Sequence, residues 1–289
     1  MQILINGLIS GSAIALLALA FQIVYLPTRV FFIALGGLYS AAPYFALAAE
    51  EAGGMTLAVA VSIAGGVGLS VLCEWASHAR LARRGASDGA QLIASLGIYI
   101  VIVQLIAMVW GNDTKTLRMG LDATTEFGED LVVTGAQWVT LVAAIVSIGG
   151  FALFLLRSNL GLRLRALANN PIQFALFGYN IDSHRLLAFA LGGLFASISA
   201  LATAYDIGFD PYAGLHAVLL AVVAVIIGGQ GSFRGPVLGA LLLGLLRAEV
   251  VWYGSARWQD AATFALLAVF LLLRPQGLLG HKTRLEASA

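Results

Sequence analysis

The sequence has almost none of the residues that build covalent cross-links or phosphate-binding loops. Its 289 residues include one cysteine, Cys73, and two lysines, Lys115 and Lys282. A single cysteine excludes both an intrachain disulfide framework and a cysteine metal cluster. Neither lysine stands in a G-x-x-x-x-G-K-[ST] run, so the chain contains no P-loop for ATP or GTP.

Motifs of common catalytic sites are also missing. The four histidines are scattered singly, and no H-E-x-x-H run exists. Ser232 in "GQGSFRG" superficially suggests a serine hydrolase, but Arg234 occupies the place where the G-x-S-x-G elbow needs a glycine. The sequence therefore predicts no enzyme active site, no metal and no cofactor bound by this chain itself.

Charged residues are also few. The chain is 60% hydrophobic and 11% charged, whereas soluble domains are about 45–50% apolar and about 25% charged. This composition predicts an integral membrane protein, and the net charge of +1 gives no bulk attraction to nucleic acid. The N-terminal stretch lacks a basic start and a cleavage site, so we expect a retained span rather than a signal peptide.

The sequence contains many long apolar segments. Crossing a bilayer takes about 20 mainly apolar residues, and helices satisfy their own backbone groups in lipid. We therefore expect an all-α, polytopic bundle of eight or nine transmembrane helices, with residues 1–289 forming a single transmembrane domain. The expected segments are 3–26, 30–49, 55–75, 90–110, 135–156, 185–204, 213–228, 236–253 and 258–273.

The segment 213–228 is the weakest of these, because it is short and runs into the glycine-rich stretch "GGQGSFRGPVLG". Irregular backbone at membrane depth is tolerated where protein buries it or a cavity borders it. A re-entrant hairpin over 213–240 is therefore the alternative. It reduces nine crossings to seven and leaves the other loops on the same sides.

The basic residues predict the orientation, because cytoplasmic loops carry an excess of lysine and arginine. With the N-terminus outside and the C-terminus cytoplasmic, twelve of the 16 basic residues fall on the cytoplasmic side. These are Arg29, Arg80, Arg83, Arg84, Arg157, Arg163, Arg165, Arg185, Arg234, Arg274, Lys282 and Arg284.

A few polar side chains fall within the apolar segments and are candidates for a translocation path. Polar groups at membrane depth are functional candidates by default. The alternative is a structural role in hydrogen bonds between helices, each worth about 0.6–2 kcal/mol. The candidates for the path are Gln22, Gln104, Thr203 and His216.

One polar segment, about 157–184, has an unusual mixture of charge and apolar bulk. It contains "GLRLRALANNPIQFALFGYNIDSHR", residues 161–185. Asn170 suits a helix N-cap, Pro171 suits the first turn, and Gly178 suits a left-handed stop. The pattern predicts a short helix over 171–177, preceded by a basic helical piece over 161–168.

Four apolar side chains lie within this short helix: Ile172, Phe174, Leu176 and Phe177. A helix of two turns is marginal in water and needs tertiary packing. Each of the four would gain about 1.5–3 kcal/mol on full burial. A groove on a partner protein is the favoured explanation, and an interfacial helix lying on lipid headgroups is the alternative.

These residues also carry a resemblance. "GLRLRALANNPIQFALFGYNIDSHRLLAFALGGL" resembles the cytoplasmic loop of the branched-chain amino acid ABC transporter permeases. The runs "INGLISGSAIALLALAFQIVY", "LIASLGIYIVIVQ", "IIGGQGSFRGPVLGALLLGLL" and "LLRPQGLLG" are similar to other parts of that family. The resemblance covers essentially the whole chain, and its compact length resembles the smaller, LivH-type permease.

The resemblance implies a coupling helix that docks on a cytoplasmic ATPase subunit. By position, the motif matches Arg163, Arg165, Asn169, Asn170, Pro171 and Gly178, with Phe174 among the apolar residues of the helix. The implied partners are a second homologous permease, two ATP-binding subunits that hold the ATP, and an extracytoplasmic substrate-binding protein. The implied location is the bacterial cytoplasmic (inner) membrane, and the implied cargo is a branched-chain or other hydrophobic amino acid.

The sequence differs from the family pattern at one place that bears on which substrate is carried. Where the family has a polar run after the first span, this chain has "FIALGG", residues 32–37. Urea, short amides or another small solute therefore remain alternatives, as does the sugar or nucleoside cargo of related permeases. An alternative of a different class is a self-sufficient channel or secondary carrier, which would transport without ATPase subunits.

Overall fold

A computed structural model describes residues 2–117, 124–126 and 132–280 of the chain. Helices dominate this part of the chain, as expected, and their bounds follow. They are α1 (Gln2–Thr28), α2 (Leu35–Cys73), α3 (Ala79–Arg83), α4 (Asp88–Trp110), α5 (Gly135–Arg157), α6 (Asn159–Asn169), α7 (Pro171–Leu176), α8 (Ile181–Ile207), α9 (Ala213–Gly228), α10 (Gly235–Tyr253) and α11 (Gln259–Leu273).

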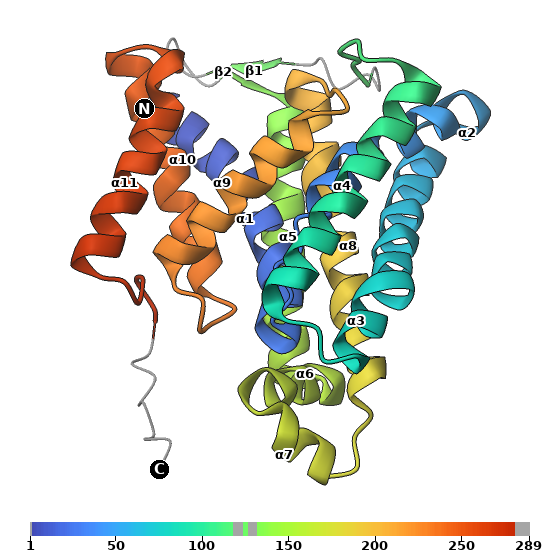
Figure 1. Ribbon diagram of the computed structural model, residues 1–289. Coiled ribbons are helices and arrows are strands. Elements are labelled where there is room, and N and C mark those ends of the chain that lie inside the picture. Colours follow the sequence, from blue (N-terminus) through green and yellow to red (C-terminus); the bar gives the residue numbers. More distant parts are fainter. Residues whose placement is uncertain (1, 118–123, 127–131, 281–289) are drawn as a thin grey trace.

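Short elements of other kinds join these helices. The π-helical turn Glu74–His78 continues α2 into α3, and the 3-10 turn Ala256–Trp258 precedes α11. The strands β1 (Thr124–Glu126) and β2 (Val132–Thr134) pair antiparallel. They form a small ribbon at the end of the bundle opposite α6 and α7 (Figure 1).

Seven helices are long and apolar enough to cross a membrane in the part of the chain that the structure describes. The two other expected segments are the first limb of α2 and the shorter α9. Gly53 and Gly54 leave helical geometry and divide α2 into two limbs, with φ at Gly54 of 68°. The expected polytopic helical bundle is therefore confirmed, with the β ribbon as a small addition.

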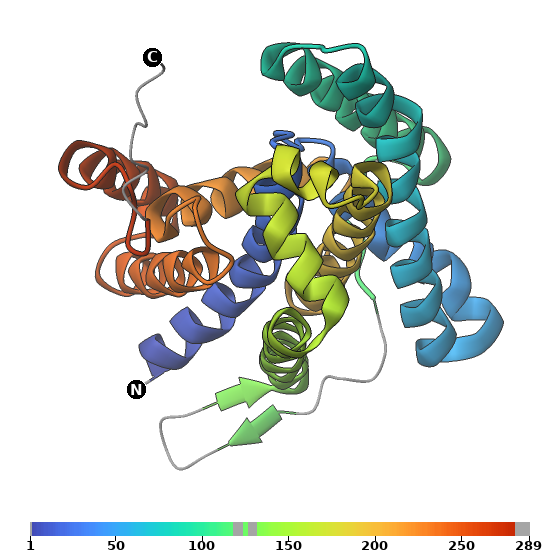
Figure 2. The same cartoon turned by 90° about the horizontal axis from the view of Figure 1, so that it is seen from below.

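α1 and α8 form the centre of the bundle. α1 packs along both α8 and α10, and α2 packs along α8. α10 and α11 lie on one flank, whereas α4 and the second limb of α2 lie on the opposite flank (Figures 1 and 2). Seen from below, α6 and α7 lie over the middle of the bundle (Figure 2). This end of the molecule is called the loop end below, and the opposite end is called the ribbon end.

Small residues bring α10 close against α1. A Cβ built on Gly11 would lie 3.1 Å from the Cα of Leu241, and Gly244 faces the backbone of Gly11. Backbones approach this closely only where side chains are absent, as at membrane helix interfaces rich in small residues. α9 and α10 form a hairpin whose turn, residues 229–234, points toward the loop end (Figure 1).

Candidate functional site

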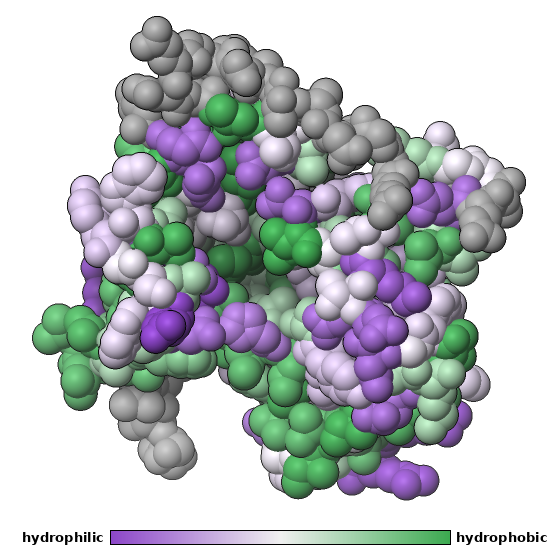
Figure 3. Space-filling model, turned by 90° about the horizontal axis from the view of Figure 1, so that it is seen from above, coloured by the Kyte–Doolittle hydropathy of each residue, from purple (hydrophilic) through white to green (hydrophobic). Residues whose placement is uncertain are grey.

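A cavity of about 690 Å³ lies at the ribbon end of the bundle. It is formed by the first half of α1, the end of α8, the start of α9 and the end of α10, with contributions from α2, α5 and α11. Figure 3 looks into this end and shows a hollow that is apolar in its depth and ringed by hydrophilic residues. The size suits a small organic solute, since ligand pockets are typically about 300–1,000 Å³.

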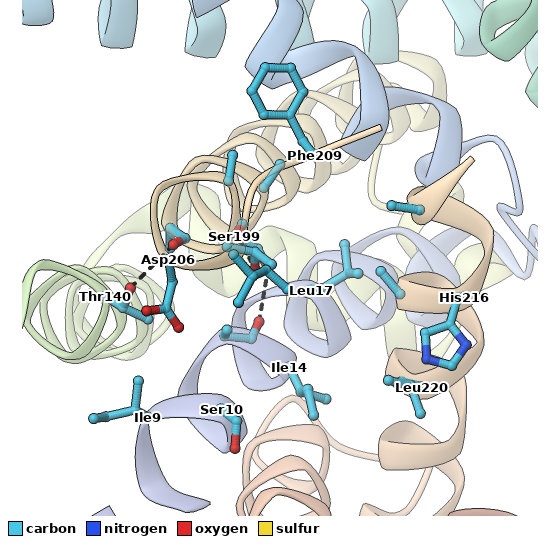
Figure 4. Close-up of a pocket in the computed structure, with 18 of the residues that line it drawn as sticks. Ile9, Ser10, Ile14, Leu17, Thr140, Ser199, Asp206, Phe209, His216 and Leu220 are labelled. Atoms are coloured by element: carbon cyan, nitrogen blue, oxygen red, sulfur yellow. Dashed lines mark hydrogen bonds between the residues drawn. The ribbon is translucent and has the colours of Figure 1, made fainter. Parts of the chain in front are cut away.

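The walls of the cavity divide into an apolar part and a polar rim. The apolar part includes Ile9, Ile14, Leu17 and Leu220 from α1 and α9. Figure 4 shows these side chains together, with Asp206 on one side of them and His216 on the other. The remaining polar lining includes Asn6, Ser10, Gln137, Thr140, Ser199, Thr203, Asp210, Arg247 and Gln259.

Arg247 belongs to a hydrogen-bonded group on one side of the rim. Its Nη1 donates to Asp260 Oδ1 at 2.9 Å and to Thr263 Oγ1 at 3.2 Å. His216 Nε2 lies 3.7 Å from the same Asp260 oxygen. The side chain of Arg247 is only 14% exposed, so these partners hold a cation in a fixed place beside the cavity.

Two aspartates lie on the side contributed by the end of α8. Asp210 Oδ1 accepts the backbone N–H of Tyr212 at 2.8 Å and of Ala213 at 3.1 Å, so it caps the start of α9. Asp206 points toward the cavity (Figure 4) and has no hydrogen-bond or ion-pair partner among the residues that the structure describes. The rim therefore offers an uncompensated carboxylate to a bound solute.

The four residues expected along the path do not gather in one place. Thr203 and His216 line the cavity. Gln104 is exposed on α4, on the flank of the bundle and away from the cavity. Gln22 is fully buried further along α1, where its amide nitrogen bonds the turn between α9 and α10. Polarity within an apolar segment could not distinguish these environments, because each depends on which way the helix faces.

The apolar run 32–37 is part of the packed core and does not line the cavity. Phe32 is fully buried and its ring lies 4.8 Å from the ring of Phe189. Ala34 donates its backbone N–H to Ser95 Oγ at 2.9 Å. The apolar character of this run therefore gives no information about the polarity of the cavity.

The loop over 157–184 has the expected local structure. The basic piece is α6, somewhat longer than expected, and the short helix is α7, which ends one residue early. Asn170 Oδ1 accepts the backbone N–H of Gln173 at 3.0 Å, and Pro171 occupies the first turn of α7. Gly178 has φ of 82°, the left-handed conformation that stops a helix.

Phe174 differs from the expectation of four exposed apolar side chains. It is 2% exposed, because its ring packs against Tyr179 at 5.1 Å and His184 at 4.9 Å. The start of α8 supplies the covering that the sequence pattern did not reveal. Phe174 therefore holds the loop together from inside and is not available to a partner.

The other three apolar side chains of this helix are exposed. Ile172, Leu176 and Phe177 are 75%, 82% and 79% exposed, and they are called the apolar peg below. Arg163 lies over the ring of Tyr179 at 4.8 Å from its centroid, and Asn169 is exposed at the end of α6. Arg165 is partly buried, and its Nε has no partner among the described residues.

Two ion pairs attach the start of α8 to the segment after α2. Arg83 Nη2 lies 2.7 Å from Asp182 Oδ2 at the surface. Arg185 donates to Glu74 at 2.6 and 3.2 Å, and both side chains are buried. The sequence did not predict the second pair, because a charge near the end of an apolar segment is normally expected to reach water.

Comparisons with known proteins agree over nearly the whole chain. The family model for the permease component of branched-chain amino acid transport systems matches residues 3–272. The chain is 29% identical over 298 residues to the high-affinity branched-chain amino acid transport system permease protein BraD of Pseudomonas aeruginosa, covering 97% of this chain and 96% of BraD. It is 28% identical to LivH of Escherichia coli K12, a permease protein of the same kind of system, covering 97% and 96%.

More distant similarities are consistent with this. The xylose transport system permease protein XylH of Escherichia coli K12 is 29% identical over 182 residues, covering 54% of this chain and 46% of XylH. The solved structure of PsaBC from Streptococcus pneumoniae in complex with Fab shares the fold, with a TM-score of 0.54 at 11% identity, covering 96% of this chain and 93% of that one. Together with the seven apolar spans, these relatives identify a multi-pass protein of the cytoplasmic membrane. The chain belongs to the family of permease components of branched-chain amino acid transport systems.

Proposed function

We propose that this chain is the permease subunit of an ATP-binding cassette importer that carries branched-chain or other hydrophobic amino acids into the cytoplasm. It acts with a second homologous permease, two cytoplasmic ATP-binding subunits and an extracytoplasmic substrate-binding protein. The observation that carries this proposal is the apolar peg. It stands exposed at the loop end of a chain whose sequence contains no nucleotide-binding motif.

The loop beneath the peg supports a docking role. Asn170 caps α7, Gly178 ends it, and Phe174 packs inside the loop. The peg is therefore held in a defined shape while three large apolar side chains stay in the open. Each would gain about 1.5–3 kcal/mol on burial in a groove, which matches the recognition of a short helix by a cleft on another protein. An ATPase subunit that grips the peg can then push on α6 and α8.

The proposed orientation follows from the same end of the molecule. Arg29, Arg84 and Arg157 terminate or precede helices at the loop end, and α3 and α6 add further arginines there. Basic loops face the cytoplasm. The loop end therefore faces the ATPase subunits, and the cavity at the ribbon end faces outward, where a binding protein delivers its cargo.

The lining of the cavity supports an amino acid as cargo. A branched-chain amino acid at neutral pH carries an ammonium group, a carboxylate and an apolar side chain. Asp206 offers an unpaired carboxylate for the ammonium group. Arg247 also borders the cavity, but Asp260 already balances its charge. Ile14 and Leu17 offer apolar surface for the side chain. A sugar, urea or an amide carries no full charge to compensate Asp206.

Reconstitution in proteoliposomes tests the class of transporter. We expect no uptake of leucine by this chain alone, and ATP-dependent uptake once the second permease, the ATPase subunits and a loaded binding protein are present. Uptake by the isolated chain at the same rate would contradict the proposal and favour a channel or secondary carrier. Uptake of urea, an amide or a sugar in preference to leucine by the full assembly would contradict the cargo.

A cross-linking experiment tests what the peg touches. A photoreactive maleimide is attached to Leu176→Cys in a Cys73→Ala background, with Asp113→Cys, exposed at the ribbon end, as the control. We expect the Leu176 probe to capture an ATP-hydrolysing subunit in membranes of cells that express the assembly. Capture of phospholipid alone would contradict the docking role and support an interfacial helix.

A further inference from the structure

The amide of Gln22 ties α1 to the turn between α9 and α10. Gln22 is fully buried, and its Nε2 donates to the carbonyl oxygens of Gln230 at 2.6 Å and Ser232 at 3.1 Å. Its own Oε1 is buried and has no partner among the described residues. One side chain therefore holds the glycine-rich turn 229–234 through two hydrogen bonds and leaves one of its own polar atoms unsatisfied.

A second attachment holds the same turn from its other side. Residues 274–280, called the strap below, follow α11 and bond the end of α9. Leu278 donates its N–H to the carbonyl of Ile227 at 2.8 Å, and Leu279 donates to Gly228 at 3.0 Å. Gly277 has φ of 74°, and a Cβ there would lie 2.5 Å from the backbone nitrogen of Gly229. The close approach of strap and turn therefore requires glycine.

These attachments lie on the helices that form the cavity, further toward the loop end. On α1, Gln22 follows the cavity residue Leu17 by five positions, or about 7.5 Å at 1.5 Å per residue. On α9, Gly228 follows the cavity residue Leu220 by eight positions, or about 12 Å. α10 begins at Gly235 beside the turn and ends at the cavity. The turn and the strap thus lie at the loop end of the same group of helices whose ribbon end contains the cavity.

The turn also contacts α5, which leads into the loop over 157–184, called the docking loop below. Phe233 of the turn packs edge-on against Phe151 of α5, with ring centroids 5.7 Å apart. Phe151 in turn packs against Phe195 of α8 at 5.5 Å. α5 leads into α6 through Ser158 alone. A chain of packed aromatic rings therefore connects the turn to α5 and α8, which flank the docking loop.

From these contacts we propose that Gln22, the turn 229–234 and the strap form the gate that closes the translocation path on the ATPase side, with Gln22 as its positioning residue. The inference rests on the proposed function, because it assumes that the cavity is the outer part of the path. In this structure the gate is shut and the cavity is open at the ribbon end. A push on the docking loop breaks the two bonds of the Gln22 amide and moves the turn away from the strap.

Removing the Gln22 amide tests the gate. Gln22→Leu keeps a similar volume and removes both donors, whereas Gln104→Leu removes an exposed glutamine from α4 as the matched control. In the reconstituted full assembly without ATP, Gln22→Leu should raise the passive efflux of preloaded leucine about tenfold, as expected for the loss of two ordinary hydrogen bonds. Efflux that equals the wild-type and Gln104→Leu values, with equal amounts of assembled protein, would overturn the proposal.

A reversible lock tests the same gate without depending on the stability of that variant. Gln22→Cys and Ser232→Cys are combined with Cys73→Ala and treated with a bifunctional methanethiosulfonate reagent. We expect ATP-driven uptake to fall at least about tenfold in the cross-linked assembly and to return after reduction, while the same treatment leaves the uptake of each single-cysteine variant at its own untreated value. Unchanged uptake in the cross-linked assembly would contradict the proposed gate. Uptake by the untreated wild-type assembly that does not depend on ATP would instead contradict the proposed function.

Discussion

Arg185 and Glu74 form a buried ion pair that joins the start of α8 to the end of α2. Nε of Arg185 lies 2.6 Å from Oε1 of Glu74, and Nη2 lies 3.2 Å from Oε2. The side chains are 10% and 1% exposed. Arg185 lies in the first turns of α8, directly after the docking loop, and Glu74 directly follows the second limb of α2. The pair therefore ties the end of the docking loop to α2.

Breaking this pair should destabilise the bundle. Arg185→Met leaves the carboxylate of Glu74 buried without a counter-charge, and loss of one partner of a buried pair costs about 3–5 kcal/mol. Arg83→Met is the matched control, because its pair with Asp182 is exposed and worth about 0–1 kcal/mol. Denaturant unfolding of the purified variants in detergent measures both. Equal stability of the two variants would show that the buried pair is not needed for folding.

The peg and Phe174 should respond differently to truncation. Phe174→Ala removes a ring that is buried inside the loop and should cost about 3–5 kcal/mol of local stability. Leu176→Ala and Phe177→Ala remove exposed side chains, so their effect on stability should stay within about 0.5 kcal/mol. We expect both of these to reduce co-purification of the ATPase subunit. Limited proteolysis of the loop and pull-down of that subunit separate the two effects, and normal pull-down with both exposed residues truncated would contradict the docking role.

Gly178→Ala should deform the end of α7. A residue with a Cβ is strained at φ of 82° and costs about 1–3 kcal/mol in this conformation. The strain should move the peg relative to α8 and lower coupled uptake more than it lowers the amount of protein in the membrane. Gly149→Ala on α5 is the control, because a Cβ there meets nothing within 4 Å. A ratio of uptake to ATP hydrolysis that matches the control would refute the expectation.

Asp206 should determine whether the cargo needs an ammonium group. Asp206→Asn removes the uncompensated carboxylate at the rim of the cavity. A hydrogen bond to a charged group contributes about 1.5–3 kcal/mol, so the substrate concentration for half-maximal uptake should rise about tenfold or more. Competition between leucine and its deaminated analogue checks the reason, because the variant should discriminate less between them. Asp113→Asn, at the same end but outside the cavity, should behave as wild type.

The local features of the docking loop were predictable from the sequence. Asn170, Pro171 and Gly178 act on backbone groups within a few residues of themselves, so their roles as cap, first-turn residue and stop follow from short-range geometry. The burial of Phe174 was not predictable, because Tyr179 and His184 reach it only after the chain turns at Gly178. The sequence therefore indicated a peg but assigned it one residue too many.

The surroundings of the four candidate path residues were also not predictable from the sequence, because they depend on contacts between distant segments. Gln22, Gln104, Thr203 and His216 all stand within apolar segments, and apolar length alone predicts that those segments are membrane helices. Thr203 and His216 face the cavity, Gln104 faces outward, and Gln22 meets a turn more than 200 positions away in the chain.

Sequence by itself determined that the chain is a helical membrane protein of the permease family. It also determined which segments are helical and that the polar segment 157–184 lies between two of them. These properties depend on composition and on neighbours a few residues apart. Tertiary structure alone decided that Glu74 meets Arg185, that Asp206 and Arg247 border one cavity, and that Gln22 holds the α9–α10 turn. Such contacts depend on the rotation and depth of each helix against its neighbours, and packing of the whole bundle sets both.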